Sequence, residues 1–196
     1  MPRDPLPLKT PSLVIRPFVL DDAPRMFVLS NEDASRTWLP SQVYADEAVA
    51  VSILKFLMDQ FATPADPRRG AYVLAIEHRT SGTLIGHVGF SPFEEDVEIG
   101  FAIARDYQRR GLAAEAIVAA CRWVFQEFEL DRILGIVSTA NVASRRALAR
   151  AGFEHQTDKV MKSQGTVQPV SLYSLAAPDH ADRRPTSRDR KGDPHR

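Results

Sequence analysis

The stretch Glu98-Ile-Gly-Phe-Ala-Ile-Ala-Arg-Asp-Tyr-Gln-Arg-Arg-Gly-Leu-Ala-Ala-Glu-Ala116 predicts a buried strand, a short loop and a helix in direct succession. The first N–H groups of a helix have no partner inside the helix, and they form the positive end of its dipole. Such a helix start is a natural anion site. Gly111 allows a ligand close to the backbone, and Arg109 and Arg110 add positive charge. An ordinary strand–helix connection with a solvated arginine pair is the alternative.

The loop differs from the two common nucleotide-binding motifs. The sequence contains neither Gly-x4-Gly-Lys-Ser/Thr nor a Gly-x-Gly-x-x-Gly that follows a strand. The loop therefore predicts an anion site of another kind.

Hydrophobic periodicity outward from this stretch predicts alternating strands and helices. Residues 71–77, 83–90 and 97–104 read as three strands whose connections, at 79–82 and 92–96, are too short for crossovers, so we expect an antiparallel meander. Helices are expected at 23–30, 46–61, 112–128 and 143–151, the last ending at Gly152, and further strands at 13–18, 131–139, from 153 and at 167–175. The order predicts an α+β (mixed α/β) fold, a mostly antiparallel central sheet of about seven strands flanked by about four helices.

Length and composition indicate how the chain is divided into domains, which partners it has and where in the cell it is expected. The 196 residues suit one domain at 12–176, after an extended lead-in at 1–11 and before a disordered polar tail at 177–196. Lys+Arg and Asp+Glu both number 25, so no net charge attracts nucleic acid or a membrane. Cys121 is the single cysteine, and we find neither a secretory signal nor an apolar run that spans a bilayer. We expect a cytoplasmic protein, a monomer or a homodimer.

The segment Gln108-x-x-Gly111-x-Ala113 resembles the Gln/Arg-x-x-Gly-x-Gly/Ala signature of the GNAT N-acetyltransferase superfamily. Other segments resemble its RimJ/RimL-type (ribosomal-protein-alanine N-acetyltransferase-like) branch, in the same order over roughly residues 9–176. They are Leu13–Phe18 with Asp21-Asp22, Gly82–Gly86, Val97–Phe101, Asn141–Ser144 with Leu148 and Gly152-Phe153, and Tyr173–Leu175. The branch's ribosomal-protein members carry an acidic residue shortly before the last strand, whereas Val160–Gly165 has none, which weakens the expectation of a ribosomal-protein substrate.

The resemblance implies a GNAT-like fold and an acyltransferase that transfers groups other than aminoacyl groups. It also implies acetyl-CoA as co-substrate, no metal, and a coenzyme pyrophosphate bound by backbone amides of the loop. The implied coenzyme contacts are Ile99, Ile103, Gln108, Arg109, Arg110, Gly111, Leu112, Ala113, Asn141 and Ser144.

Acetyl transfer to an amine requires removal of a proton from the amine, a donor to the carbonyl oxygen and a proton for the thiolate. Glu98, on the strand before the loop, is the first candidate base, although it has an alternative role in structuring the site or binding the substrate ammonium. His87 is the second candidate, with a structural alternative. Resemblance makes Ser144 the acid, while Asn141 and Ser144 also suit helix capping. Cys121 is expected to pack in the core.

The expected acceptor pocket lies between the first two helices and the last hairpin. Trp38, Leu39, Phe56, Phe90 and Phe93 are candidate wall residues, or equally core residues.

The predicted function is acetyl transfer from acetyl-CoA to a primary amine, either a peptide N-terminus or a small molecule, by direct attack in a ternary complex. The alternative is a non-catalytic acyl-CoA-binding sensor or partner domain. The tail carries four Asp and no aromatic residue, so it favours no nucleic-acid partner.

Overall fold

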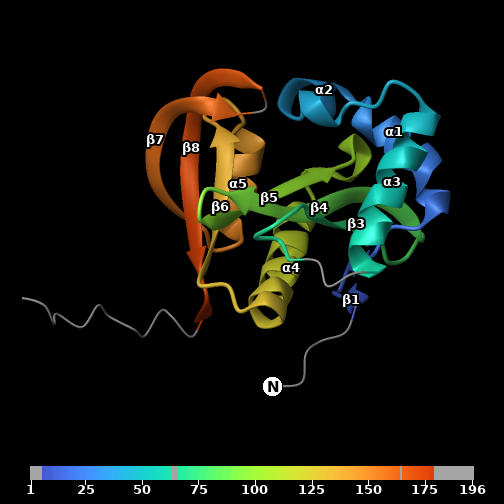
Figure 1. The fold of residues 1–196 in the computed structure, drawn as a ribbon, viewed down its shortest axis with the longest axis horizontal. Coiled ribbons are helices and arrows are strands. Elements are labelled where there is room, and N and C mark those ends of the chain that lie inside the picture. The colour runs from blue at the N-terminus through green and yellow to red at the C-terminus, as the bar shows by residue number, and fades with distance from the viewer. Residues whose placement is uncertain (1–5, 63–65, 164, 179–196) are drawn as a thin grey trace, which may run out of the picture.

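The computed structural model describes residues 6–62, 66–163 and 165–178, and within them the strands form one sheet in the order β1-β2-β3-β4-β5-β6-β8-β7 (Figure 1). The strands are β1 (Leu8–Lys9), β2 (Leu13–Arg16), β3 (Tyr72–His78), β4 (Thr83–Phe93), β5 (Asp96–Ile103), β6 (Arg132–Ser138), β7 (Glu154–Ser163) and β8 (Thr166–Ala176). The α-helices are α1 (Ala23–Ser30), α2 (Asp33–Trp38), α3 (Glu47–Ala62), α4 (Leu112–Phe128) and α5 (Val142–Arg150). Short 3-10 turns occupy η1 (Leu20–Asp22), η2 (Pro40–Gln42) and η3 (Arg105–Tyr107).

The sheet confirms the predicted mixed α/β class and the antiparallel meander of β3, β4 and β5. The prediction of a turn over residues 92–96 is wrong. Pro92 pairs with Val97 and Phe93 with Asp96, so β4 extends through both residues, and Glu94 takes a left-handed φ of 54° in the tight connection. Leu8–Lys9 of the expected lead-in also pairs as a strand, with β2.

Helix α4, which the sequence predicts at 112–128, buries an apolar stripe. Ala116, Ile117, Ala120 and Val124 are fully buried, and α4 packs against β2, β4 and β5. In Figure 1, α4 lies below strands β3 to β5, whereas α1 and α2 lie above them. Cys121 is buried on α4, and burial raises the pKa of its thiol, so the structure supports the packing role.

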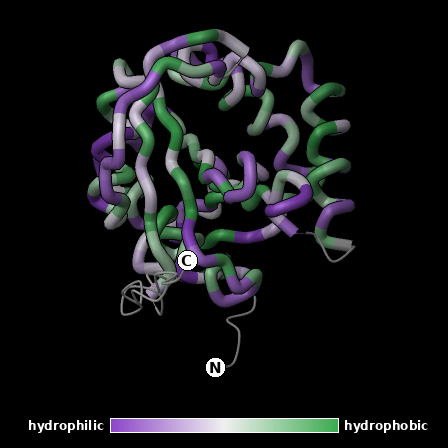
Figure 2. The backbone as a smooth tube through the Cα atoms, turned by 60° about the vertical axis from the view of Figure 1, so that its left-hand side comes forward, coloured by the Kyte–Doolittle hydropathy of each residue, from purple (hydrophilic) through white to green (hydrophobic). Residues whose placement is uncertain are grey.

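The core follows the strands at the centre of the sheet. Leu74, Ile76, Ile85, Val88 and Ile133 are fully buried there. Figure 2 shows the same distribution, with hydrophobic stretches along neighbouring strands and hydrophilic stretches over outer connections. Burial of this apolar surface is the main stabilising contribution to such a sheet.

The parallel pair β5–β6 differs from every other neighbour in the sheet. Its register covers Glu98 opposite Leu134 and Ile99 opposite Gly135, although β5 continues to Ile103 and β6 to Ser138. The two strands are therefore joined near one end of β5 and diverge beyond it.

Several sequence predictions fall outside what the structure describes. Residues 1–5 of the lead-in, residues 63–65 of the expected loop and residues 179–196 of the expected tail lie outside the described residues, so the domain limits stay predictions. A search of the described helices finds none both long and apolar enough to cross a membrane.

Gly86 supplies a test of the β4–β5 packing. A Cβ at Gly86 would overlap the carbonyl oxygen of Ala102 on β5, so we expect Gly86→Ala to destabilise the protein by about 1–3 kcal/mol, as overpacking does. Gly100→Ala, in the partner strand where a Cβ meets open space, is the control. Urea unfolding measures both, and equal midpoints would contradict the close approach.

Candidate active site

A cavity of about 900 Å³ opens where β5 and β6 diverge. Gly100–Ile103 of β5 and Ile136–Ser138 of β6 line it, as do residues of α1, α2, η2, the start of α4, α5 and the β7–β8 hairpin. The hairpin curves over toward α2 in Figure 1, and both contribute to the lining. A site this size accommodates a large extended ligand.

The start of α4 has the geometry of an anion site. Gly111 is the N-cap with φ 82°, and Arg109 two residues earlier has φ 61°, so the backbone bends sharply into the helix. The Glu115 N–H donates to the Gly111 carbonyl at 3.1 Å, so the N–H groups of Leu112, Ala113 and Ala114 precede the first helical bond. Gln108 holds the loop, because its side-chain amide donates to the Ile103 carbonyl at 2.9 Å. This donor set fits a diphosphate.

The two loop arginines separate in space. Arg109 lines the cavity. Arg110 does not contribute to its lining: its guanidinium donates to the Asp106 carbonyl at 2.7 Å and lies 5.3 Å from the Tyr107 ring centre. The geometry therefore supports Arg109 as a ligand contact and gives Arg110 a role in holding the loop.

The start of α5 faces the same cavity. The Asn141 side-chain oxygen accepts from the Ser144 N–H at 3.1 Å, which is an N-cap interaction, and both residues line the cavity. Arg145 braces this turn, since its guanidinium donates to the Thr139 carbonyl at 3.2 Å and to the Tyr173 hydroxyl at 3.3 Å. The capping role of Asn141 is thus observed, and the Ser144 hydroxyl sits on a fixed turn.

Glu98 lies at the joined end of β5, facing Ser91 of β4. Burial raises the pKa of the Glu98 carboxyl, and the hydrogen bond with Ser91, 3.4 Å between Oγ and Oε1, opposes that shift. A carboxylate with a raised pKa is a better proton acceptor than an ordinary one. Glu98 and Ser91 both line the cavity.

His87 lies on β4 and also lines the cavity. Burial lowers the pKa of its imidazole to about 4. The ring is therefore neutral at physiological pH and a weak base, which favours Glu98 over His87 for proton removal.

The residues expected in the acceptor wall or in the core divide among different surroundings. Trp38 and Leu39 line the cavity, but Phe56 is 60% exposed on α3 and outside the lining, while Phe90 is 1% exposed in the core. Phe93 is also absent from the cavity lining. It lies at the end of β4, where it pairs with Asp96 of β5. The aromatic residue type alone does not show whether a side chain lines the cavity, lies in the core or is exposed to solvent.

Sequence reasoning named Trp38 and Leu39 as wall residues but missed α2, the helix that ends at Trp38. No residue of α2 is buried, so no hydrophobic stripe marks it. A contact from another part of the chain holds α2 in place. The carboxylate of Glu32, the N-cap of α2, accepts a hydrogen bond from the Arg105 N–H at 2.9 Å, and Arg105 lies just before the loop that leads into α4. Asp33, an acidic residue in the first turn, was the available signal for this helix. Ser91, Arg146 and Arg150 were also missed.

The cavity thus brings together most of the predicted site residues. They are His87, Glu98, Ile99, Ile103, Gln108, Arg109, Gly111, Leu112, Ala113, Asn141 and Ser144. Among the described residues, no group of three or more His, Cys, Asp or Glu side chains is arranged to hold a metal ion.

A family model described as an acetyltransferase (GNAT) domain matches residues 12–154. The chain belongs to the GNAT acetyltransferase family. A curated relative, the uncharacterized N-acetyltransferase YoaA of Bacillus subtilis (strain 168), is 29% identical over 178 residues, covering 87% of this chain and 97% of that protein. Family membership makes this chain an acyltransferase, and GNAT enzymes use acetyl-CoA.

Solved structures share the fold. The ribosomal-protein-S5-alanine acetyltransferase from Vibrio fischeri superposes with a TM-score of 0.73 at 18% identity, over 88% of this chain and 97% of that chain. The microcin C7 self-immunity acetyltransferase MccE, solved with acetyl-CoA and AMP, gives 0.71 at 17% identity, over 86% and 94%. These likenesses confirm the predicted GNAT-like fold.

The Ser91 contact predicts a pKa change at Glu98. Ser91→Ala removes the donor that favours the carboxylate, so we expect the pKa of Glu98 to rise further. Titration of the Glu98 carboxyl carbon by NMR measures it. Ser91→Thr keeps a hydroxyl and serves as control; an unchanged pKa in Ser91→Ala would show that the contact has no electrostatic effect.

Proposed function

We propose that this protein transfers an acetyl group from acetyl-CoA to a primary amine by direct attack in a ternary complex. The observation that carries the proposal is that the start of helix α4 and the partly buried Glu98 carboxylate face the same cavity. Glu98 precedes Ile103 by five residues on β5, about 16 Å of strand. A coenzyme held by its diphosphate at Gly111 therefore extends its pantetheine arm along β5 toward Glu98.

Each chemical requirement of the reaction has a candidate group in the cavity. Glu98 accepts a proton from the ammonium, directly or through water, and the free amine attacks the thioester carbonyl. A backbone N–H of β5 within Gly100–Ile103 donates to the carbonyl oxygen as negative charge builds. The new C–N bond replaces the C–S bond, Ser144 donates a proton to the departing thiolate, and the second proton of the attacking nitrogen, relayed through water, restores the Ser144 hydroxyl. The products are an acetylamide and CoA.

The coenzyme contacts follow from the same placement. Backbone N–H groups of Gly111, Leu112, Ala113 and Ala114 hold the diphosphate, with Arg109 at the rim. Ile99 and Ile103 border the arm from β5, and Asn141 borders it from α5. The complex of MccE with acetyl-CoA supports this coenzyme for the shared fold. A cytoplasmic location and a monomeric or homodimeric state stay predictions of the sequence.

Gly111→Asp tests the coenzyme site. It places a carboxylate where a diphosphate must approach, so we expect loss of measurable acetyl-CoA binding in calorimetry. The parent protein, mixed with acetyl-CoA and a pool of amines, should release free CoA thiol in an amine-dependent manner, and the variant should not.

Gly111→Asn is the matched control for that variant. Asparagine has the shape of aspartate without its charge and tolerates the positive φ of this position better than most residues. We expect the Asn variant to keep measurable binding, at least about tenfold tighter than the Asp variant. Equal affinity of both variants and the parent would contradict the assigned coenzyme site.

Glu98→Gln tests the base. A base works in its deprotonated form, so the rate is present above the raised pKa of Glu98 and is lost as pH falls through it. We expect Glu98→Gln to lower kcat by about 10²–10⁴-fold and to remove this acidic limb, with acetyl-CoA affinity retained. The measurement is thiol release against pH; a profile identical to the parent's would exclude Glu98 as the base.

A further inference from the structure

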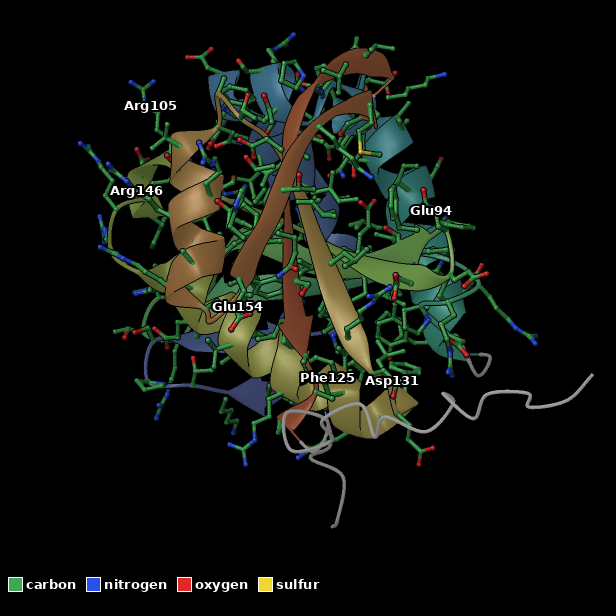
Figure 3. The ribbon with its side chains drawn as sticks, turned by 90° about the vertical axis from the view of Figure 1, so that its left-hand side faces the viewer. Glu94, Arg105, Phe125, Asp131, Arg146 and Glu154 are labelled. Atoms are coloured by element: carbon green, nitrogen blue, oxygen red, sulfur yellow. The ribbon has the colours of Figure 1, made fainter. Side chains whose placement is uncertain are left out.

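The charges that line the cavity are segregated by structural element. The coenzyme half is the lining contributed by residues 108–114 and 141–150, and it holds the cavity's arginines, Arg109, Arg146 and Arg150. Figure 3 shows Arg146 on the same side of the molecule as Arg105, which follows β5. Three cations at this half suit the phosphates of a coenzyme.

The acceptor half is the lining contributed by α1, α2, η2, β4 and the β7–β8 hairpin, together with Glu32 and Glu98. Its charged groups are these two carboxylates, because His87, with its pKa lowered to about 4, is neutral. Among the described residues, no Lys or Arg lines this half. Its remaining surface is apolar or uncharged: Met26, Leu29, Trp38 and Leu39 on one side, Ser163, Thr166 and Gln168 of the hairpin on another.

The arginines nearest in sequence to this half are committed elsewhere. Arg36 of α2 donates to Asn31, to its carbonyl at 3.0 Å and to its side-chain oxygen. Arg25 of α1 donates to the Leu84 carbonyl at 3.2 Å. Neither contributes to the lining, so a carboxylate entering the acceptor half meets Glu98 and Glu32 without a compensating cation.

From this charge distribution, and resting on the proposed acetyl transfer, we infer that the acceptor is an amine with no carboxylate beside it and with an apolar substituent. Such an acceptor is a peptide N-terminus, an amide or an amino alcohol, and not a free α-amino acid. Its ammonium group is attracted to the carboxylates, and the apolar walls take its substituent. The α-carboxylate of a free amino acid would be desolvated next to like charge, which is strongly unfavourable.

Leucine and leucinol form the matched test pair, since they share a side chain and amines of similar basicity and differ in the carboxylate. With acetyl-CoA saturating and at low salt, we expect kcat/KM from thiol release to be at least about tenfold higher for leucinol than for leucine. The amide of the peptide Leu-Ala is the third acceptor. Its amine has a lower pKa than that of leucinol, so the two values are compared per free amine. A value then above that of leucinol identifies a peptide as the source of the amine.

A variant of the cavity wall isolates the charge effect. Gln42 of η2 lines the acceptor half, so Gln42→Arg adds the missing cation and Gln42→Met adds similar length without charge. We expect the leucinol-to-leucine ratio to fall at least about threefold in Gln42→Arg relative to Gln42→Met. Comparing ratios removes any general loss of activity in either variant.

Two results separate failure of this inference from failure of the proposed function. Turnover of leucine at the rate of leucinol, or turnover of leucine while both carboxylate-free acceptors stay inactive, overturns the acceptor inference alone, because acetyl transfer itself is then observed. Absence of acetyl-CoA binding contradicts the acetyl transfer itself and the inference that rests on it.

Discussion

The divergence of β5 from β6 is the constraint on which the rest of the structure depends. Two neighbouring strands normally pair along their shared length, and a parallel pair without ladder bonds exposes polar backbone groups. Here the register stops after Ile99 and Gly135, and a cavity lies between the unpaired continuations. The surrounding elements maintain the separation, since β4 pairs with β5 up to Ile103 and β8 pairs with β6 up to Ser138. Each strand is thus held by its outer neighbour while its inner edge stays available to a ligand.

Gly135 shows how closely α5 depends on this arrangement. A Cβ at Gly135 would meet the Leu148 side chain at 2.8 Å, so glycine at the end of the β5–β6 register lets α5 approach β6. The buried Leu148 then fixes the helix, and the Asn141 cap and the Arg145 contacts fix its first turn. The position of Ser144 thus depends on the packing of Leu148 as well as on the hydrogen bond from its own N–H to Asn141.

The sequence predicts the features of this fold that are encoded locally. Apolar runs mark β3 and β4, burial alternates at the start of β5, and the apolar stripe of α4 shows the helical period. The loop from Gln108 to Ala113 has a recognisable composition. Features set by tertiary contact escaped prediction. Helix α2 buries no residue and is tied to the chain by the contact between Glu32 and the distant Arg105, which no local pattern reveals. The same limit applies to Phe56 and Phe90, whose exposure differs completely although their residue type is the same.

Glu115 illustrates how a charge near an anion site is made compatible with it. A carboxylate in the first turn of α4 suits the helix dipole but would repel a diphosphate at the same helix start. Its oxygen Oε1 accepts from the Thr10 hydroxyl at 2.6 Å and from the Ser12 N–H at 2.8 Å. Burial alone would raise the pKa of Glu115, but these hydrogen bonds outweigh it and the pKa is lowered. The carboxylate therefore anchors the segment before β2 to α4, and its negative charge is directed at donors there rather than into the cavity.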